Sequence, residues 1–95
     1  MEQIRRLTAL IEREDDDQGE SSYVALCPEI DIASQGSTIE EARANLVEAL
    51  TLFFESADAS EIKQRLRPEV FITQVFITQL FITQVFITQV DIQVA

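Results

Sequence analysis

The sequence predicts an α+β domain: a small antiparallel sheet with one main amphipathic helix packed on it, a short second helix and an extended C-terminal strand region. Three observations support this prediction. Strand-like segments come first, a run of apolar residues at helical spacing follows, and the C-terminal region is rich in β-branched and aromatic residues. A chain of 95 residues buries enough surface for one modest core, so we expect no second folded domain.

The N-terminal segment predicts a β-hairpin. Residues 4–13 alternate as a strand, with Leu7, Ala9 and Ile11 on one side, although Leu10 makes the sidedness imperfect. An acidic loop with one glycine follows, and a hairpin is its natural connection to the next strand.

The next segment predicts two further strands. Residues 23–27 have strand character, and Pro28 ends or edges that strand because proline lacks a backbone donor. Ile30 and Ile32 then place β-branched side chains on one side of a short third strand. The dipeptide at 35–36, Gln-Gly, predicts the turn that leads to the helix.

The main helix is predicted by its start signal and its periodicity. Thr38 and Glu41 have the spacing of a capping box, in which side chains satisfy free backbone donors at a helix start. Apolar residues then recur at helical spacing: Ile39, Ala42, Leu46, Ala49, Leu50 and Phe53.

A second short helix is predicted after the main one. Asp58 with Glu61, or Ser60 alone, would cap it, and it would run to about Leu66. Pro68 disfavours helix at the residue before it, so the chain becomes extended from there.

From residue 71 to 90 the chain consists of four five-residue units, FITQV, FITQL, FITQV and FITQV, and DIQVA follows. Because strand side chains alternate, a period of five sends Phe71 to one face of a strand and Phe76 to the other. The repeat therefore requires regular bends or bulges, two strands with a tight turn, or burial of both faces. A further alternative for its path is a single coil of a β-solenoid. The simplest origin of the repeat is the expansion of one ancestral five-residue unit.

Residues 23–50, YVALCPEIDIASQGSTIEEARANLVEAL, resemble the HicB-like antitoxins of prokaryotic type II toxin–antitoxin systems. The resemblance covers roughly residues 4–75 and the last few residues, so residues 1–69 would form the HicB-like domain and 70–95 its C-terminal strand region or an oligomerisation strand. It implies a partial ribonuclease H-like fold and a non-enzymatic role, in which the protein covers the active face of a small basic ribonuclease toxin. Family members often carry a DNA-binding segment, but no helical pattern or basic patch follows Leu66, so we expect no direct DNA binding.

The charge of the chain favours a basic protein partner over nucleic acid. Its net charge is −10 and it has only seven Lys and Arg residues, whereas phosphate binding needs clustered cations. The residues that we expect on an acidic contact face are Asp15, Asp16, Asp17, Tyr23, Pro28, Glu29 and Asp31. Tyr23 and Pro28 have an alternative role, which is simply to define the hairpin.

The composition argues against catalysis. The chain has no histidine, and its one cysteine, Cys27, has neither a general base nor a second thiol, so it is expected to pack in a strand. The acidic run at 14–17 is typical of a solvated loop, although with Glu29 and Asp31 it could form a degenerate metal site. We therefore expect no catalytic residue, metal or cofactor. A reducing cytoplasmic location fits the single cysteine, and no apolar run at the N-terminus is long enough for a signal peptide.

The C-terminal repeat supports a different role, self-association. It has no charge, proline or glycine to protect a strand edge, so pairing between chains would satisfy its backbone groups. The residues expected to contribute are Phe71, Phe76, Phe81 and Phe86. Membrane insertion is disfavoured because Thr and Gln occupy two positions of each unit. The leading interpretation is thus an oligomeric HicB-like antitoxin or antitoxin-derived binding protein, the alternative is a self-associating structural module, and a degenerate metal-dependent nuclease comes third.

Overall fold

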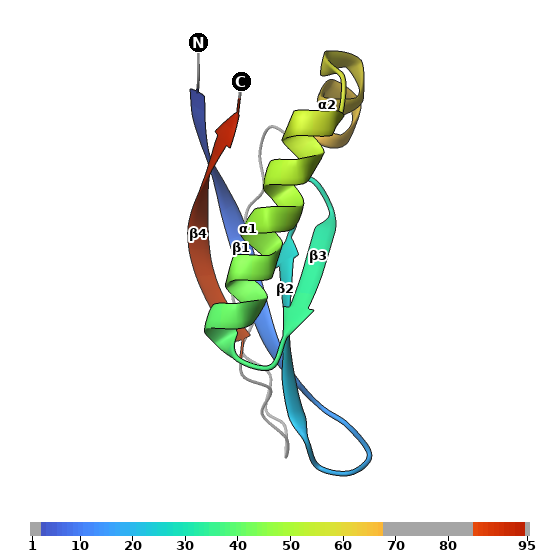
Figure 1. Cartoon of the computed structure of the whole chain (residues 1–95), viewed down its shortest axis with the longest axis vertical. Helices are drawn as coiled ribbons and strands as arrows, with labels where there is room; N and C mark the ends of the chain where they lie inside the picture. Colours follow the sequence, from blue (N-terminus) through green and yellow to red (C-terminus); the bar gives the residue numbers. More distant parts are fainter. Residues whose placement is uncertain (1–2, 68–84, 95) are drawn as a thin grey trace, which may run out of the picture.

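Four antiparallel strands and two helices form the part of the chain that the computed structural model describes, residues 3–67 and 85–94. In chain order, the elements are β1 (Gln3–Asp15), β2 (Ser21–Cys27), β3 (Ile32–Gly36), α1 (Ile39–Ser56), α2 (Ala59–Arg65) and β4 (Val85–Val94). The strands form one sheet in the order β3-β2-β1-β4, and α1 lies across one face of it (Figure 1). The predicted α+β class is confirmed.

The first and last strands are neighbours in the sheet. β1 pairs with β4 from Gln3 opposite Val94 to Glu12 opposite Val85, and with β2 from Leu10 opposite Leu26 to Asp15 opposite Ser21. The start of β1 and the end of β4 consequently lie at the same end of the sheet (Figure 1). The last strand therefore completes the sheet instead of extending away from it.

The core lies between α1 and the sheet. Its buried members are Leu7, Ala9, Ile11, Ala25, Cys27, Ile30, Ala42, Leu46, Leu50, Val90 and Ile92. The alternation predicted for the first strand is confirmed, since Leu7, Ala9 and Ile11 are all buried and Leu10 points to the opposite face. Burial of these side chains is the main driving force for packing α1 on the sheet.

The start of α1 confirms the predicted cap. The Thr38 hydroxyl oxygen accepts a hydrogen bond from the Glu41 backbone N–H at 3.0 Å. In the other direction, the Glu41 carboxylate accepts from the N–H of Ser37 at 3.3 Å, one residue before the cap. The first bond satisfies a donor that a helix start leaves free, and the second holds the residue before the cap against the first turn.

The boundaries predicted for the third strand were wrong. Ile30 lies in the turn between β2 and β3, and residues 35–36 belong to β3 instead of a turn. The turn forms because the Asp31 N–H donates to the Cys27 carbonyl at 2.9 Å and Asp31 adopts a left-handed φ of 57°. This turn directs Ile30 into the core, where it is 1% exposed.

The second helix begins as predicted, with the Asp58 carboxylate accepting from the Glu61 N–H at 2.8 Å. The guanidinium of Arg65 lies 4.7 Å from the centre of the Phe53 ring. This cation–π contact holds α2 against the end of α1. The predictions for Phe71, Phe76 and Phe81, and for the path of the first three repeat units, fall on residues outside the described ranges.

Candidate functional site

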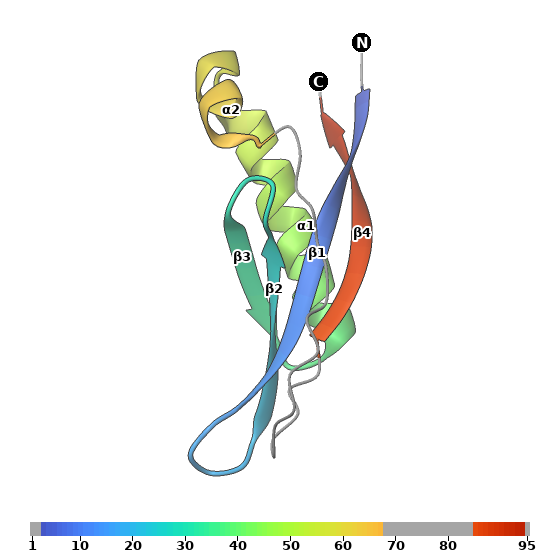
Figure 2. The same cartoon turned by 180° about the vertical axis from the view of Figure 1, so that it is seen from behind.

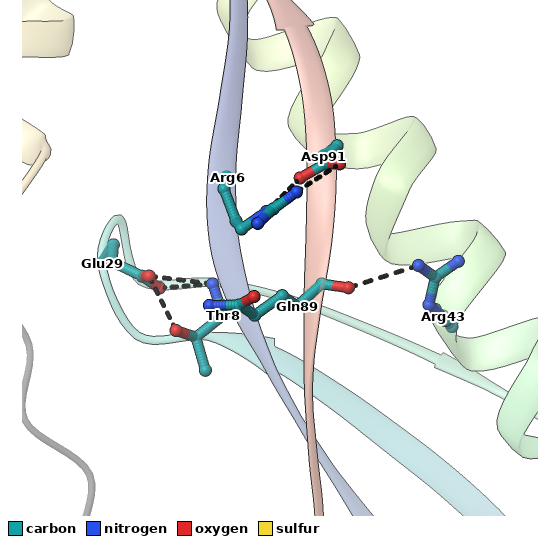
Figure 3. A network of polar contacts seen from close by, with 6 residues as sticks. All are labelled: Arg6, Thr8, Glu29, Arg43, Gln89 and Asp91. Carbon is teal, nitrogen blue, oxygen red and sulfur yellow. Dashed lines mark hydrogen bonds and ion pairs between the residues drawn. The ribbon is translucent and has the colours of Figure 1, made fainter.

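A network of polar side chains connects β1, β4 and α1 (Figure 3). The Arg6 guanidinium donates two hydrogen bonds to the Asp91 carboxylate, at 2.9 and 3.3 Å, across the β1–β4 pair. Arg43 of α1 donates to the backbone carbonyl of Gln89 at 3.3 Å. An open hollow of about 550 Å³ lies beside these groups, and it is lined by Arg6, Arg43, Val47, Thr88, Gln89 and Asp91. The network therefore fastens β4 to β1, its neighbour in the sheet, and to α1.

A second group of contacts joins β1 to the turn after β2. The Glu29 carboxylate accepts hydrogen bonds from the Thr8 N–H, at 2.8 and 3.0 Å to its two oxygens, and from the Thr8 hydroxyl at 2.8 Å (Figure 3). Because the β1–β2 ladder begins only at Leu10, this carboxylate takes the place of a backbone acceptor beyond the end of β2. Glu29 therefore has a structural role.

The thiol of Cys27 is part of the same group. Burial raises its pKa to about 12, and the charge of the nearby Glu29 carboxylate, 3.5 Å from the sulfur, adds to the effect. Nucleophilic cysteines need the opposite shift, toward thiolate. The prediction that Cys27 packs in a strand is confirmed, since it is completely buried in the core.

The Arg6–Asp91 pair makes stability depend on pH. The hydrogen bond from Arg6 lowers the pKa of Asp91, and the charges of Arg6 and Arg43 lower it further. A carboxyl group with a lowered folded-state pKa stabilises the fold above its ordinary pKa and loses this contribution as the pH falls through the lowered value. We expect the urea midpoint of the protein to exceed that of Asp91→Asn at pH 7 and the two midpoints to converge as the pH falls through the lowered pKa of Asp91. A constant difference between the two midpoints over that range would contradict this role.

The acidic loop between β1 and β2 is held by its own side chains. The Asp16 carboxylate accepts from the N–H groups of Gln18 and Glu20, at 2.8 and 2.9 Å, and closes the turn. Asp15 binds Arg13 and Ser21, and these hydrogen bonds lower its pKa. Asp17 is exposed. Two of the three acids thus shape the loop, and all three remain at the surface.

The residues expected on one acidic face lie at two ends of β2. Asp15, Asp16 and Asp17 precede its start, whereas the turn at 28–31 follows its end (Figure 1). A strand of this length spans about 20 Å, so one compact contact patch would not include both groups. Of the turn residues, Asp31 is exposed, and Glu29 uses its carboxylate internally. Tyr23 packs partly against the core, which fits its alternative role in the hairpin.

The outer face of α1 carries an acidic and apolar surface that sequence reasoning missed. Leu52 is 54% exposed, and Glu48 and Glu55, both exposed, precede and follow it at helical spacing on the same face. We name these three residues the α1 patch. The signal was present in the sequence as the spacing of 48, 52 and 55, but it lay outside the apolar stripe by which the helix was recognised.

The open face of the sheet, which is the face away from α1, carries an apolar row across all four strands. Ile87 lies opposite Leu10, Leu10 opposite Leu26, and Leu26 opposite Ala33. Within the described part of the chain, both helices leave this face uncovered (Figure 2). Ile87 is 46% exposed. Leu10, which made the sidedness of the first strand imperfect, belongs to this row.

Comparison with protein-family models, curated proteins and solved structures finds no match to this chain. In residues 3–67 and 85–94, no three His, Cys, Asp or Glu side chains converge as metal ligands would. Neither helix in these ranges is long and apolar enough to cross a membrane.

Proposed function

We propose that the protein is a binding domain of the HicB-like antitoxin type, which neutralises a small basic ribonuclease by protein–protein contact. The observation that carries this proposal is the α1 patch, in which an exposed leucine is flanked by two carboxylates. Interfaces concentrate their binding energy in a few central, well-packed anchors with a polar rim. The patch has this arrangement, with Leu52 as the anchor and Glu48 and Glu55 as the rim.

The charge of the molecule supports a basic partner. At a net charge of −10, the protein attracts cationic proteins over long range and accelerates their association. The acidic loop between β1 and β2 adds to this field at one end of the sheet. On this proposal, long-range attraction brings the partner to the protein and the α1 patch determines how tightly it stays.

The proposal predicts that a small basic protein is encoded beside this gene, and the test is calorimetric titration of the full chain with that protein. We expect Leu52→Ala to weaken binding at least about tenfold, which is the usual minimum for an interface anchor. Ile4→Ala is the matched control, because Ile4 is also an exposed apolar residue, 73% exposed, but lies on β1. Binding that Leu52→Ala leaves unchanged would contradict the assignment of the α1 patch, and absence of binding would contradict the function itself.

The apolar row on the open face favours a second candidate function, self-association. Two copies that pack these faces together would cover Ile87 and Leu10, and monomeric proteins rarely leave large apolar patches exposed. Light scattering on Ile87→Glu and on the unchanged protein tests this candidate. A lower mass for the variant supports it, and equal masses oppose it.

A further inference from the structure

The pairing of β4 with β1 divides the β4 side chains between the two faces of the sheet. Phe86, Thr88, Val90 and Ile92 face α1, and we name them the helix-facing set. Val90 and Ile92 are each 1% exposed, Thr88 is half-buried and Phe86 is 41% exposed. Between them, Ile87, Gln89 and Asp91 lie on the open face.

The same set recurs earlier in the chain. Residues 86–92 read FITQVDI, while 81–87 and 71–77 both read FITQVFI and 76–82 read FITQLFI. A shift of β4 by one unit would therefore put another Phe, Thr, Val and Ile in the places of the helix-facing set. A strand register is usually enforced because a slip moves apolar side chains out of the core. Here a slip by one whole unit leaves the residue types that face α1 unchanged.

When residues 86–92 are compared with the three earlier seven-residue segments, the position opposite Arg6 distinguishes the fourth unit from the other three. The fourth unit is followed by Asp91, which binds Arg6, whereas a phenylalanine follows each of the other three. Both members of the ion pair are largely exposed, with 64% and 49% of their side-chain surfaces accessible. Exposed ion pairs stabilise folds only slightly. The Arg6–Asp91 pair therefore favours the observed register only slightly over one in which Phe86 lies opposite Arg6.

The hydrogen bond from Arg43 does not distinguish the repeat units, because its acceptor is a backbone group. Arg43 donates to the backbone carbonyl of Gln89, and the backbone of the corresponding Gln84 offers the same acceptor in a register shifted by one unit. Outside residues 86–92, a shift by one unit would also place Thr88 opposite Ile4 in place of Gln93.

We propose that β1 and α1 together form a strand-binding site that accepts any FITQ unit of the chain, and that the Arg6–Asp91 pair selects the fourth. The ligand is a segment with Phe, Thr, Val or Leu, and Ile at alternate positions. The other units of the same chain are its natural competitors, because the tether keeps them at high local concentration. The site therefore holds two or more registers in equilibrium, and the sequence after the last unit sets their ratio.

The test uses pairs of cysteines in a Cys27→Ala background at equilibrium in a glutathione buffer. Leu10→Cys with Ile87→Cys reports the observed register, because these positions are directly opposite on the open face. Leu10→Cys with Ile82→Cys reports the register shifted by one unit. Leu10→Cys with Thr83→Cys is the control, since in the register shifted by one unit Thr83 would take the place of Thr88 and face α1, on the opposite side of the sheet from Leu10.

Each pair is measured with and without Asp91→Phe, which makes the sequence after the fourth unit match the others. We expect this change to raise the intrachain disulfide between positions 10 and 82 by about two- to fivefold, the factor that an exposed ion pair usually supplies, and to lower the one between 10 and 87. Unchanged yields on Asp91→Phe, a signal from the control pair, or a disulfide between 10 and 82 that forms only between chains would each overturn the proposal. The interchain result would assign the competing unit to a second copy.

Discussion

Replacement of Leu46 by alanine is expected to lower the free energy of unfolding by about 2–5 kcal/mol, the range for truncating a buried leucine. Leu46 is completely buried in α1, within the core between the helix and the sheet. The change removes apolar surface from the core and leaves a cavity that rigid strands can fill only in part. Domains of this size are stable by only about 5–15 kcal/mol, so a considerable share of the stability would be lost.

Urea unfolding followed by circular dichroism measures this loss. Leu52→Ala is the matched control, because it makes the same chemical change at an exposed position on the same helix, and surface substitutions usually change stability by less than about 0.5 kcal/mol. Similar urea midpoints for the two variants would contradict the assignment of Leu46 to the core. The control variant also shows that Leu52→Ala is folded when its binding is tested.

Gly36→Ala is the second substitution with a large expected effect. A Cβ atom at Gly36 would lie 2.5 Å from the backbone nitrogen of Ala42 and 2.8 Å from the carbonyl carbon of Glu41. These are backbone atoms in the first turn of α1, so they cannot move aside as a flexible side chain would. The end of β3 and the start of α1 must separate, and overpacking of this kind costs about 1–3 kcal/mol.

The measurement compares Gly36→Ala with Gly19→Ala by thermal and urea unfolding. Gly19 lies in the β1–β2 loop with a φ of 81° and open space around a Cβ position. Its substitution tests backbone conformation alone, at about 1–2 kcal/mol. We expect Gly36→Ala to be the more damaging change and to weaken the Thr38 cap nearby. A neutral Gly36→Ala would show that β3 and α1 are not in close contact.

The sequence predicted the elements whose signals are local. Thr38 and Glu41 marked the start of α1, and the alternation of Leu7, Ala9 and Ile11 marked the buried side of β1, because caps and side-chain periodicity depend on near neighbours. The third strand was displaced because a left-handed Asp31 in a tight turn leaves only a weak trace in composition. Ile30 looked like a strand residue and proved to be a core residue of that turn.

Long-range arrangements could not be predicted in the same way. The Glu29–Thr8 contact depends on how the turn after β2 meets β1, and nothing near either residue signals it. The register of β4 was ambiguous for a different reason, since the repeat units carry nearly the same side chains. Within residues 86–92, only Asp91, opposite Arg6, distinguishes the last unit from the first and third.

The measurement that tests the proposed function most directly is RNA cleavage by the small basic toxin that the proposal predicts beside this gene, titrated with the full chain. The proposal predicts that cleavage falls in proportion to the protein added, reaches zero near equimolar amounts, and requires a large excess of the Leu52→Ala variant. Cleavage that continues unchanged in excess protein, or RNA cleavage by this chain alone, would contradict it.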